Sequence, residues 1–140
     1  FLGYFSFGYV SDKIGRRPAF TLYSIIMAIS VSMITIFWNA IVDIPRIILI
    51  FLFLVGFGTG YFGGFGPLFS EQFPTKIRST GLGTIFNISR GVQFVTPVAI
   101  AMISATYQMS AGIFLAAVFA ILGGIWIWTL PETQGSELTE

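Results

Sequence analysis

The sequence is poor in the residues that carry most protein chemistry. Its 140 residues include no cysteine and no histidine, and only 9% of them are charged. Without cysteine there can be no disulfide and no thiolate metal ligand. Without histidine the commonest metal ligand and general base are absent as well. We therefore predict no catalytic residue, no metal and no cofactor in this chain.

Charge of either sign is scarce and nearly balanced. Seven basic residues face six acidic ones, so no basic excess points to a nucleic-acid partner. None of the long apolar runs contains Asp or Glu. Because acid–base catalysis needs such a group in a defined site, the chain is predicted not to be an enzyme.

Long apolar runs dominate what is present. Hydrophobic residues make up 55% of the chain and the mean hydropathy is +0.87. A membrane-spanning helix needs about 20 such residues, and strands would be shorter and alternate with period two. The sequence predicts an all-α membrane protein. Its parts are the end of one span at 1–10, complete spans at 19–38, 47–69, 79–106 and 111–130, and a polar tail at 131–140. Since Phe1 lies inside an apolar run, we expect a piece of a longer protein.

Basic residues in the connecting loops give the orientation. Five of them, Lys13, Arg16, Arg17, Lys76 and Arg78, fall in the first and third loops, and only Arg46 falls in the second. Short loops rich in Lys and Arg stay on the cytoplasmic side. The tail is therefore predicted to be cytoplasmic.

Three motifs resemble the major facilitator superfamily of transporters. Residues 8–18, GYVSDKIGRRP, resemble the basic loop between its eighth and ninth helices. Residues 70–81, SEQFPTKIRSTG, resemble the loop after the tenth helix in sugar porters and metabolite symporters. Residues 131–138, PETQGSEL, resemble the element that follows the twelfth helix of sugar porters. The order of the motifs corresponds to the C-terminal part of a 12-helix fold.

The resemblance implies a secondary active transporter that works by alternating access in a plasma membrane or bacterial inner membrane. Its partners would be the lipid bilayer, an N-terminal helical bundle outside this sequence and a small-molecule substrate. Sugar porters usually carry a glycine-proline pair followed by a tryptophan in the tenth helix, well before the glutamate, but here Pro67 lies only four residues before Glu71 and no tryptophan follows it. The resemblance is therefore closer to proton-coupled carboxylate and metabolite symporters or to organic-ion transporters.

Arg90 is the sharpest signal within a span. It lies about 17 Å along the helix from Ser79, near the middle of the bilayer. A charge there costs about 2.5–3.5 kcal/mol, so Arg90 should face the protein interior or a watery cavity. On a helical wheel its face is polar and aromatic, with Gly83, Phe86, Asn87, Gln93, Phe94, Pro97, Ala101 and Ser104, and the opposite face is apolar.

This pattern predicts a substrate site. Arg90 would bind an anionic group through two parallel hydrogen bonds, Asn87 and Gln93 would hold hydroxyl or carbonyl groups, and Phe94 would cover an apolar body. The resemblance agrees, because organic-anion transporters and aromatic-acid symporters have an arginine at this spacing. The alternative is that Arg90 pairs with a carboxylate on a helix outside this sequence, for structure or gating.

A second set of residues lies at the cytoplasmic helix ends. The resemblance implies that Asp12, Arg16, Arg17, Glu71 and Arg78 form a gating network that holds when the inner gate is closed. The alternative is a solvated loop that only sets topology. The prediction for the whole is proton-coupled symport of a small organic anion or carboxylate metabolite. A sugar or polyol transporter and a transport-silent membrane scaffold are the alternatives.

Overall fold

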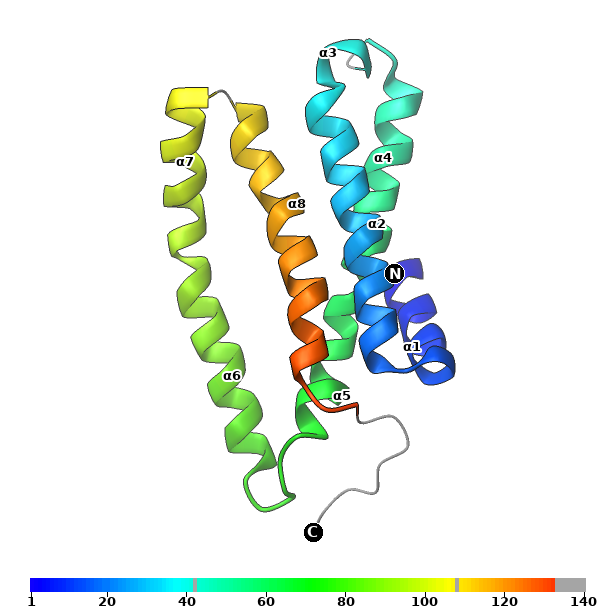
Figure 1. Ribbon diagram of the computed structural model, residues 1–140, viewed down its shortest axis with the longest axis vertical. Coiled ribbons are helices and arrows are strands. Elements are labelled where there is room, and N and C mark those ends of the chain that lie inside the picture. The colour runs from blue at the N-terminus through cyan, green and yellow to red at the C-terminus, as the bar shows by residue number, and fades with distance from the viewer. Residues whose placement is uncertain (42, 108, 133–140) are drawn as a thin grey trace.

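The computed structural model describes residues 1–41, 43–107 and 109–132, and these residues are almost entirely helical (Figure 1). Most of the predicted tail at 131–140 lies outside the described residues. The elements are α1 (Leu2–Ile14), α2 (Arg16–Ile36), α3 (Trp38–Ile41), α4 (Pro45–Gly58), the 3₁₀ helix η1 (Thr59–Gly64), α5 (Phe65–Ser70), α6 (Arg78–Gln93), α7 (Val95–Tyr107), α8 (Met109–Trp126) and the 3₁₀ helix η2 (Ile127–Thr129).

Four helical stretches are long and apolar enough to cross a membrane, which confirms the predicted all-α membrane fold. They are Arg16–Ile36, Arg46–Ser70, Arg78–Tyr107 and Met109–Thr129. Two of them are interrupted. The second passes from α4 through η1 to α5, and the third passes from α6 to α7 at Phe94.

The connection between α1 and α2 is shorter than the loop between residues 10 and 19 that the sequence predicted. Helix α1 continues through Asp12 and Lys13 to Ile14, and α2 begins at Arg16, so a single glycine joins them. Gly15 has φ 101°, a conformation that side chains with a Cβ rarely adopt. Pro18 is the third residue of α2. Its missing N–H costs nothing there, because the first turn of a helix has no internal acceptors.

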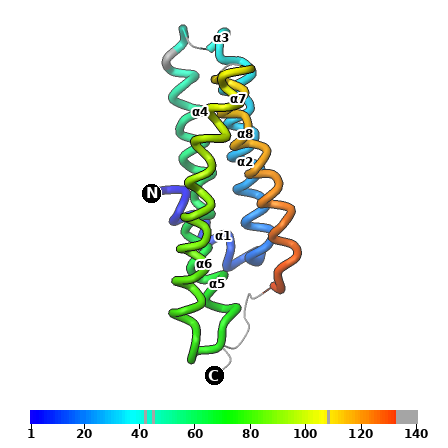
Figure 2. The backbone as a smooth tube through the Cα atoms, turned by 90° about the vertical axis from the view of Figure 1, so that its left-hand side faces the viewer, coloured from blue at the N-terminus to red at the C-terminus, as the bar shows by residue number. Residues whose placement is uncertain are grey.

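Helix α2 is the centre of the packing, in contact with α1, α4 and α8. One core cluster joins it to α1, α5 and η2, through Phe7, Ala19, Phe20, Tyr23, Leu68 and Ile127. A second joins it to α8, through Ala28, Val31, Ala117 and Ala120. Figures 1 and 2 show the four spans running side by side, with α6 and α7 on the outer edge of the layer. The helices α6 and α7 have no buried residue.

Glycines let α1 approach the interrupted second span. A Cβ on Gly60 would collide with the backbone carbonyl of Gly3, and a Cβ on Gly64 would collide with the ring of Phe7. Both glycines lie in η1 or at its end, where the α-helical pattern changes to 3₁₀. Small residues at such crossings replace the bulk that would hold two membrane helices apart.

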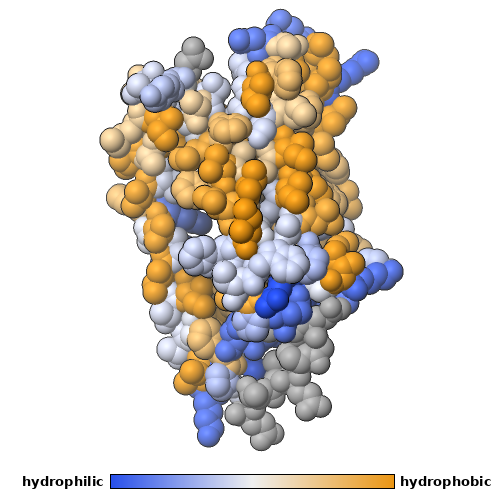
Figure 3. All heavy atoms as spheres, viewed as in Figure 1, coloured by the Kyte–Doolittle hydropathy of each residue, from blue (hydrophilic) through white to orange (hydrophobic). Residues whose placement is uncertain are grey.

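Large apolar side chains cover the shafts of the helices. Leu49, Phe53, Ile125 and Val92 are among those more than half exposed. Figure 3 shows this apolar surface over the length of the visible face, with hydrophilic residues gathered mainly near the two ends. An apolar band between polar ends is what a bilayer requires, and it agrees with an integral membrane protein.

Candidate functional site

The charged cluster lies where α1, α2, α5 and the end of η2 meet. We use this name for Asp12, Arg16, Arg17, Glu71, Arg78 and Glu132. Arg16 is its centre. Its Nη1 donates to Ser11 Oγ at 2.9 Å and to Asp12 Oδ1 at 3.1 Å, and its Nη2 donates to Glu71 Oε1 at 3.0 Å. One guanidinium therefore ties the end of α1 and the end of α5 to the start of α2.

The two ion pairs of Arg16 differ in their exposure. The side chains of Arg16 and Glu71 are each 16% exposed, whereas that of Asp12 is 71% exposed. An exposed pair contributes little because water screens it, and a shielded pair interacts more strongly. The Arg16–Glu71 pair is therefore the stronger contact between helices.

Glu132 is a member that the sequence reasoning missed. Its Oε1 accepts from the backbone N–H of Arg16 at 2.9 Å, and its Oε2 accepts from that of Arg17 at 3.1 Å. These are the first two N–H groups of α2, which no backbone carbonyl of that helix can satisfy. A carboxylate also complements the positive end of the helix dipole. The signal was available, because Glu132 is the acid of the PETQG element that follows the last span.

Arg17 and Arg78 belong to the cluster in a different way. Arg17 Nη2 donates to the carbonyl of Leu130, and Arg78 Nε donates to the carbonyl of Ser70 at 2.9 Å. Neither makes an ion pair with a carboxylate among the described residues. Arg17 therefore fastens α2 to the end of η2, and Arg78 fastens α6 to the end of α5. Of the five predicted network residues, Asp12, Arg16 and Glu71 are joined directly by ion pairs.

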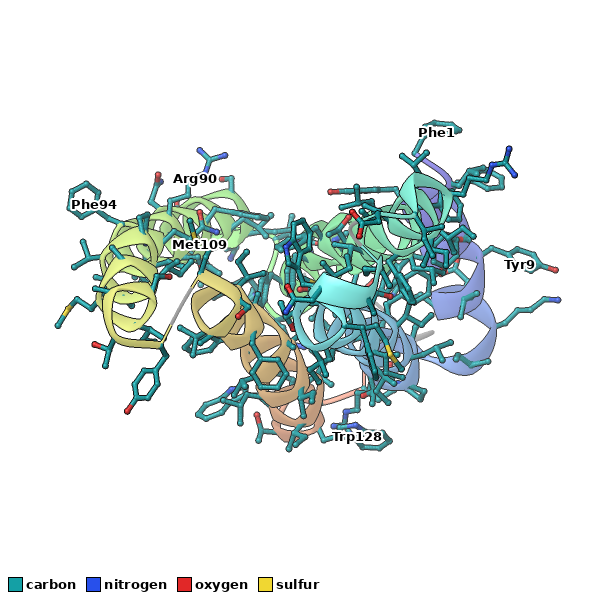
Figure 4. The ribbon with its side chains drawn as sticks, turned by 90° about the horizontal axis from the view of Figure 1, so that it is seen from above. Phe1, Tyr9, Arg90, Phe94, Met109 and Trp128 are labelled. Atoms are coloured by element: carbon teal, nitrogen blue, oxygen red, sulfur yellow. The ribbon has the colours of Figure 1, made fainter. Side chains whose placement is uncertain are left out.

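The environment of Arg90 is the opposite of that of Arg16. It lies in the last turn of α6 and is exposed, and no side chain in the described parts of the chain bonds to it. Seen from above, Arg90 and Phe94 project to one side of the helix layer and Trp128 projects to the other (Figure 4). A guanidinium held on that face can bind a carboxylate through two parallel hydrogen bonds.

The break after α6 has a chemical cause. Pro97 has no N–H to donate to the carbonyl of Gln93, and its ring crowds that carbonyl. The chain responds with a tight turn in which the Phe94 N–H donates to the carbonyl of Gly91 at 3.2 Å. The break at Phe94 lies four residues after Arg90. Discontinuous helices near the middle of the bilayer are typical of substrate sites in transporters.

The other predicted substrate residues are placed separately. Asn87 Nδ2 donates to the carbonyl of Gly83 in its own helix at 2.7 Å, and Phe94 is 83% exposed. Gln93 lies at a cavity of about 660 Å³. This cavity is lined by Gln93, Thr96, Pro97, Ile100, Ala101, Ser104 and Met109. The structure thus puts Gln93 on the wall of an open groove that Arg90 and Asn87 do not line.

No group of three acidic side chains that could hold a metal gathers within residues 1–41, 43–107 and 109–132. What the two sites offer is ion pairing and hydrogen bonding. The charged cluster can fasten or release helix ends, and the region around Arg90 can bind an anion.

Comparison with known proteins gives a consistent result. The whole chain, residues 1–140, matches the family model described as sugar (and other) transporter. A metabolite transport protein of Haemophilus influenzae is 31% identical over 137 residues, which cover 97% of this chain and 33% of the relative. A protein of Cupriavidus pinatubonensis named as a 4-methylmuconolactone transporter is 33% identical over 131 residues, covering 90% of this chain and 29% of its own length.

The cis,cis-muconate transport protein of Acinetobacter baylyi is 30% identical over 134 residues, covering 95% of this chain and 32% of the relative. The chain thus spans about a third of the length of these curated relatives. The predicted resemblance to major facilitator transporters is confirmed. The chain belongs to the sugar (and other) transporter family, whose members are membrane transport proteins and not enzymes.

Proposed function

We propose that the chain is the C-terminal part of a secondary active transporter that carries a small organic anion or carboxylate metabolite together with protons. Transport proceeds by alternating access, in which this bundle and an N-terminal bundle move about a central site. The observation that carries the proposal is Arg90, a charged residue deep in a span with no described partner. The tail and the charged cluster lie on the cytoplasmic side in this proposal.

The depth of Arg90 in the membrane determines what its charged group must contact. It lies twelve residues after Arg78 in a 30-residue span, about 18 Å from the end that holds the charged cluster. A guanidinium at this depth is costly unless it faces water or an anion. Substrate carboxylate at Arg90 would satisfy the charge during each transport cycle. Gln93 and Asn87 would contact hydroxyl or carbonyl groups, and Phe94 would cover the apolar body.

The names of the relatives support an anionic substrate. The protein from Acinetobacter baylyi is named for cis,cis-muconate, which is a carboxylate anion. We propose that the intact transporter of this chain recognises substrates of similar chemistry. The proton site would lie in the N-terminal bundle, because no span of this chain contains Asp or Glu.

The charged cluster would act as the cytoplasmic latch. Arg16 joins α1, α2 and α5 through one exposed and one partly buried ion pair, and Glu132 adds the chain that follows η2. Such pairs contribute little net stability because desolvation offsets their attraction. They can nevertheless separate two discrete arrangements of the helix ends. The latch would be closed when the site opens to the outside.

Uptake into proteoliposomes by the intact transporter tests the proposal. We expect labelled cis,cis-muconate to accumulate when the outside is acidic, and a protonophore to abolish the accumulation. A labelled neutral hexose serves as the control substrate at the same concentration. Accumulation of the hexose with no uptake of any carboxylate would contradict the anion proposal.

A sugar or polyol transporter is the second candidate. The family description and the PETQG element favour it. In that case Arg90 would pair with a carboxylate of the N-terminal bundle, and hexose uptake would not depend on its charge.

A further inference from the structure

An aromatic pocket lies among α2, η1, α5 and α8. Its volume is about 360 Å³. Seven of its lining residues are aromatic, namely Phe20, Tyr61, Phe62, Phe65, Phe69, Phe119 and Trp126. Helix α8 adds Ala120 and Gly123, and η2 adds Ile127. None of the lining residues comes from α6. The pocket is too large for a well-packed membrane bundle to leave empty in every state.

The α8 wall of this pocket continues an interface that already exists. Higher on α8, Gly112 packs against Ile100 and Ser104 of α7. On a helical wheel at 100° per residue, Phe119, Gly123 and Trp126 lie within about 40° of Gly112. The face of α8 that contacts α7 above is therefore the face that lines the pocket below. Toward the charged cluster, the third span on that side of α8 consists of α6.

Helix α6 has an apolar side that is not yet buried. Leu82 and Ile85 are half-buried, Ile88 one turn further along the same side is 63% exposed, and no residue of α6 is fully buried. Counting from the ends that hold the charged cluster, Ile85 lies seven residues after Arg78 and Gly123 lies seven residues before Leu130. Both therefore lie about 10 Å into the span.

Gly123 gives independent support. A Cβ at Gly123 would meet nothing within 4 Å, whereas a Cβ at the next residue, Gly124, would lie 3.0 Å from Ser24 Cβ. Gly124 is explained by the packing of α8 on α2. Gly123 lies within a helix, where a glycine lowers helix stability. The open space beside it shows no close contact that would require a glycine there. A helix that packs closely at this point in another state would require it.

We propose that the aromatic pocket is a docking site for α6. The α6 helix swings about the break at Phe94 and places Leu82 and Ile85 between the rings of α5 and η1 and the open side of Gly123. Docking would bury the apolar side of α6 and leave Arg90 on the opposite side, toward the proposed substrate site.

A pair of introduced cysteines tests the docking directly in the intact transporter, in a background without other cysteines. A disulfide requires the two Cβ atoms to come within about 4.5 Å. We expect Ile85→Cys with Gly123→Cys to become protected from a maleimide reagent after mild oxidation, and to react again after reduction. The matched control is Gly83→Cys with Gly123→Cys, which should stay reactive because position 83 lies about 160° from position 85 on a helical wheel.

Any other pattern overturns the proposal. If neither pair forms a disulfide, the pocket has another occupant, such as a lipid chain. If both pairs form it, α6 has no defined docking face. The test does not involve substrate, so its failure and the failure of the anion proposal are distinguishable.

Uptake by a variant whose aromatic pocket is filled gives a second measurement. Gly123→Leu adds bulk where the described structure has space, so the protein should fold and reach the membrane. We expect kcat for uptake to fall roughly tenfold with KM little changed, since a step of about 1.4 kcal/mol in the conformational barrier has that effect. Ile125→Trp, which adds bulk on another side of α8, is the control. An unchanged kcat for Gly123→Leu would overturn the proposal.

Discussion

Arg16 and Arg90 are the same residue type in opposite situations. Arg16 lies at a helix end and has its guanidinium bonded to Ser11, Asp12 and Glu71. Arg90 lies deep in a span and has no partner among the described residues. A charge whose partners are all within one bundle can set the position of helices. A charge at membrane depth without such partners must find them elsewhere, in substrate or in another bundle.

The largest expected effect follows from Arg90→Ala. Loss of one partner from a desolvated charge pair costs about 2–5 kcal/mol. We therefore expect carboxylate uptake at low substrate concentration to fall by at least roughly 30-fold. Arg90→Lys keeps the charge but loses the planar fork, so the apparent KM should rise. Expression should be unaffected, because removal of the charge favours membrane insertion.

Arg46→Ala is the matched control for Arg90→Ala. Arg46 begins the second span at the opposite end from the charged cluster, so the same loss of charge should leave uptake unchanged. Binding of labelled substrate in detergent separates the two roles of Arg90. If Arg90→Ala binds the carboxylate as tightly as the parent protein, Arg90 is structural and the sugar alternative becomes the better one.

A smaller effect is expected at the partners of Arg16. Glu71→Gln weakens the shielded ion pair, and Asp12→Asn weakens the exposed one. If the cluster is a latch, Glu71→Gln should shift the resting protein toward the inward-open state by about 1–2 kcal/mol, a factor of roughly 5–30 in population. Asp12→Asn should change it by no more than about twofold.

Labelling of a cysteine at position 87 measures this shift. Position 87 lies on α6 one turn before Arg90, and an impermeant maleimide added outside should react more slowly in the Glu71→Gln background. Equal rates in the Glu71→Gln and Asp12→Asn backgrounds would mean that burial of the pair does not matter, and the latch would lose its basis.

The spans were predictable because one physical requirement dominates them. A bilayer demands about 20 apolar residues in a helix, and that pattern is visible without any tertiary information. The interruptions were less accessible. The 3₁₀ segment at Thr59–Gly64 lies where α1 approaches at Gly3, a tertiary contact that no local pattern reports.

In the candidate sites, too, some features could be predicted from the sequence and others could not. The resemblance to the family implied that Arg16 and Glu71 belong to one cluster, and the structure joins them by an ion pair. The resemblance did not separate the ion pairs of Arg16 from the carbonyl contacts of Arg17 and Arg78, since those depend on side-chain direction. Whether Arg90 binds substrate stays a prediction, because a wheel gives a face of the helix and not what lies opposite.

The smallest effect is expected at Glu132, and it concerns how firmly the cluster is assembled. Glu132 satisfies two N–H groups at the start of α2 and complements the helix dipole. Glu132 is exposed, so the effect of Glu132→Ala should be at the low end for a cap, about 0.5–1 kcal/mol. The apparent Tm in detergent should fall by about 2–4 °C.

Charge and hydrogen bonding at Glu132 can be separated. Glu132→Gln keeps an acceptor oxygen but loses the charge, so its Tm should lie between those of the parent and Glu132→Ala. Asp43→Ala, which removes an acidic residue from the turn before α4, is the control and should leave Tm unchanged. If Glu132→Ala behaves like that control, the N-terminus of α2 is satisfied by water, and the fastening of the chain after α8 rests on the contact between Arg17 and the carbonyl of Leu130.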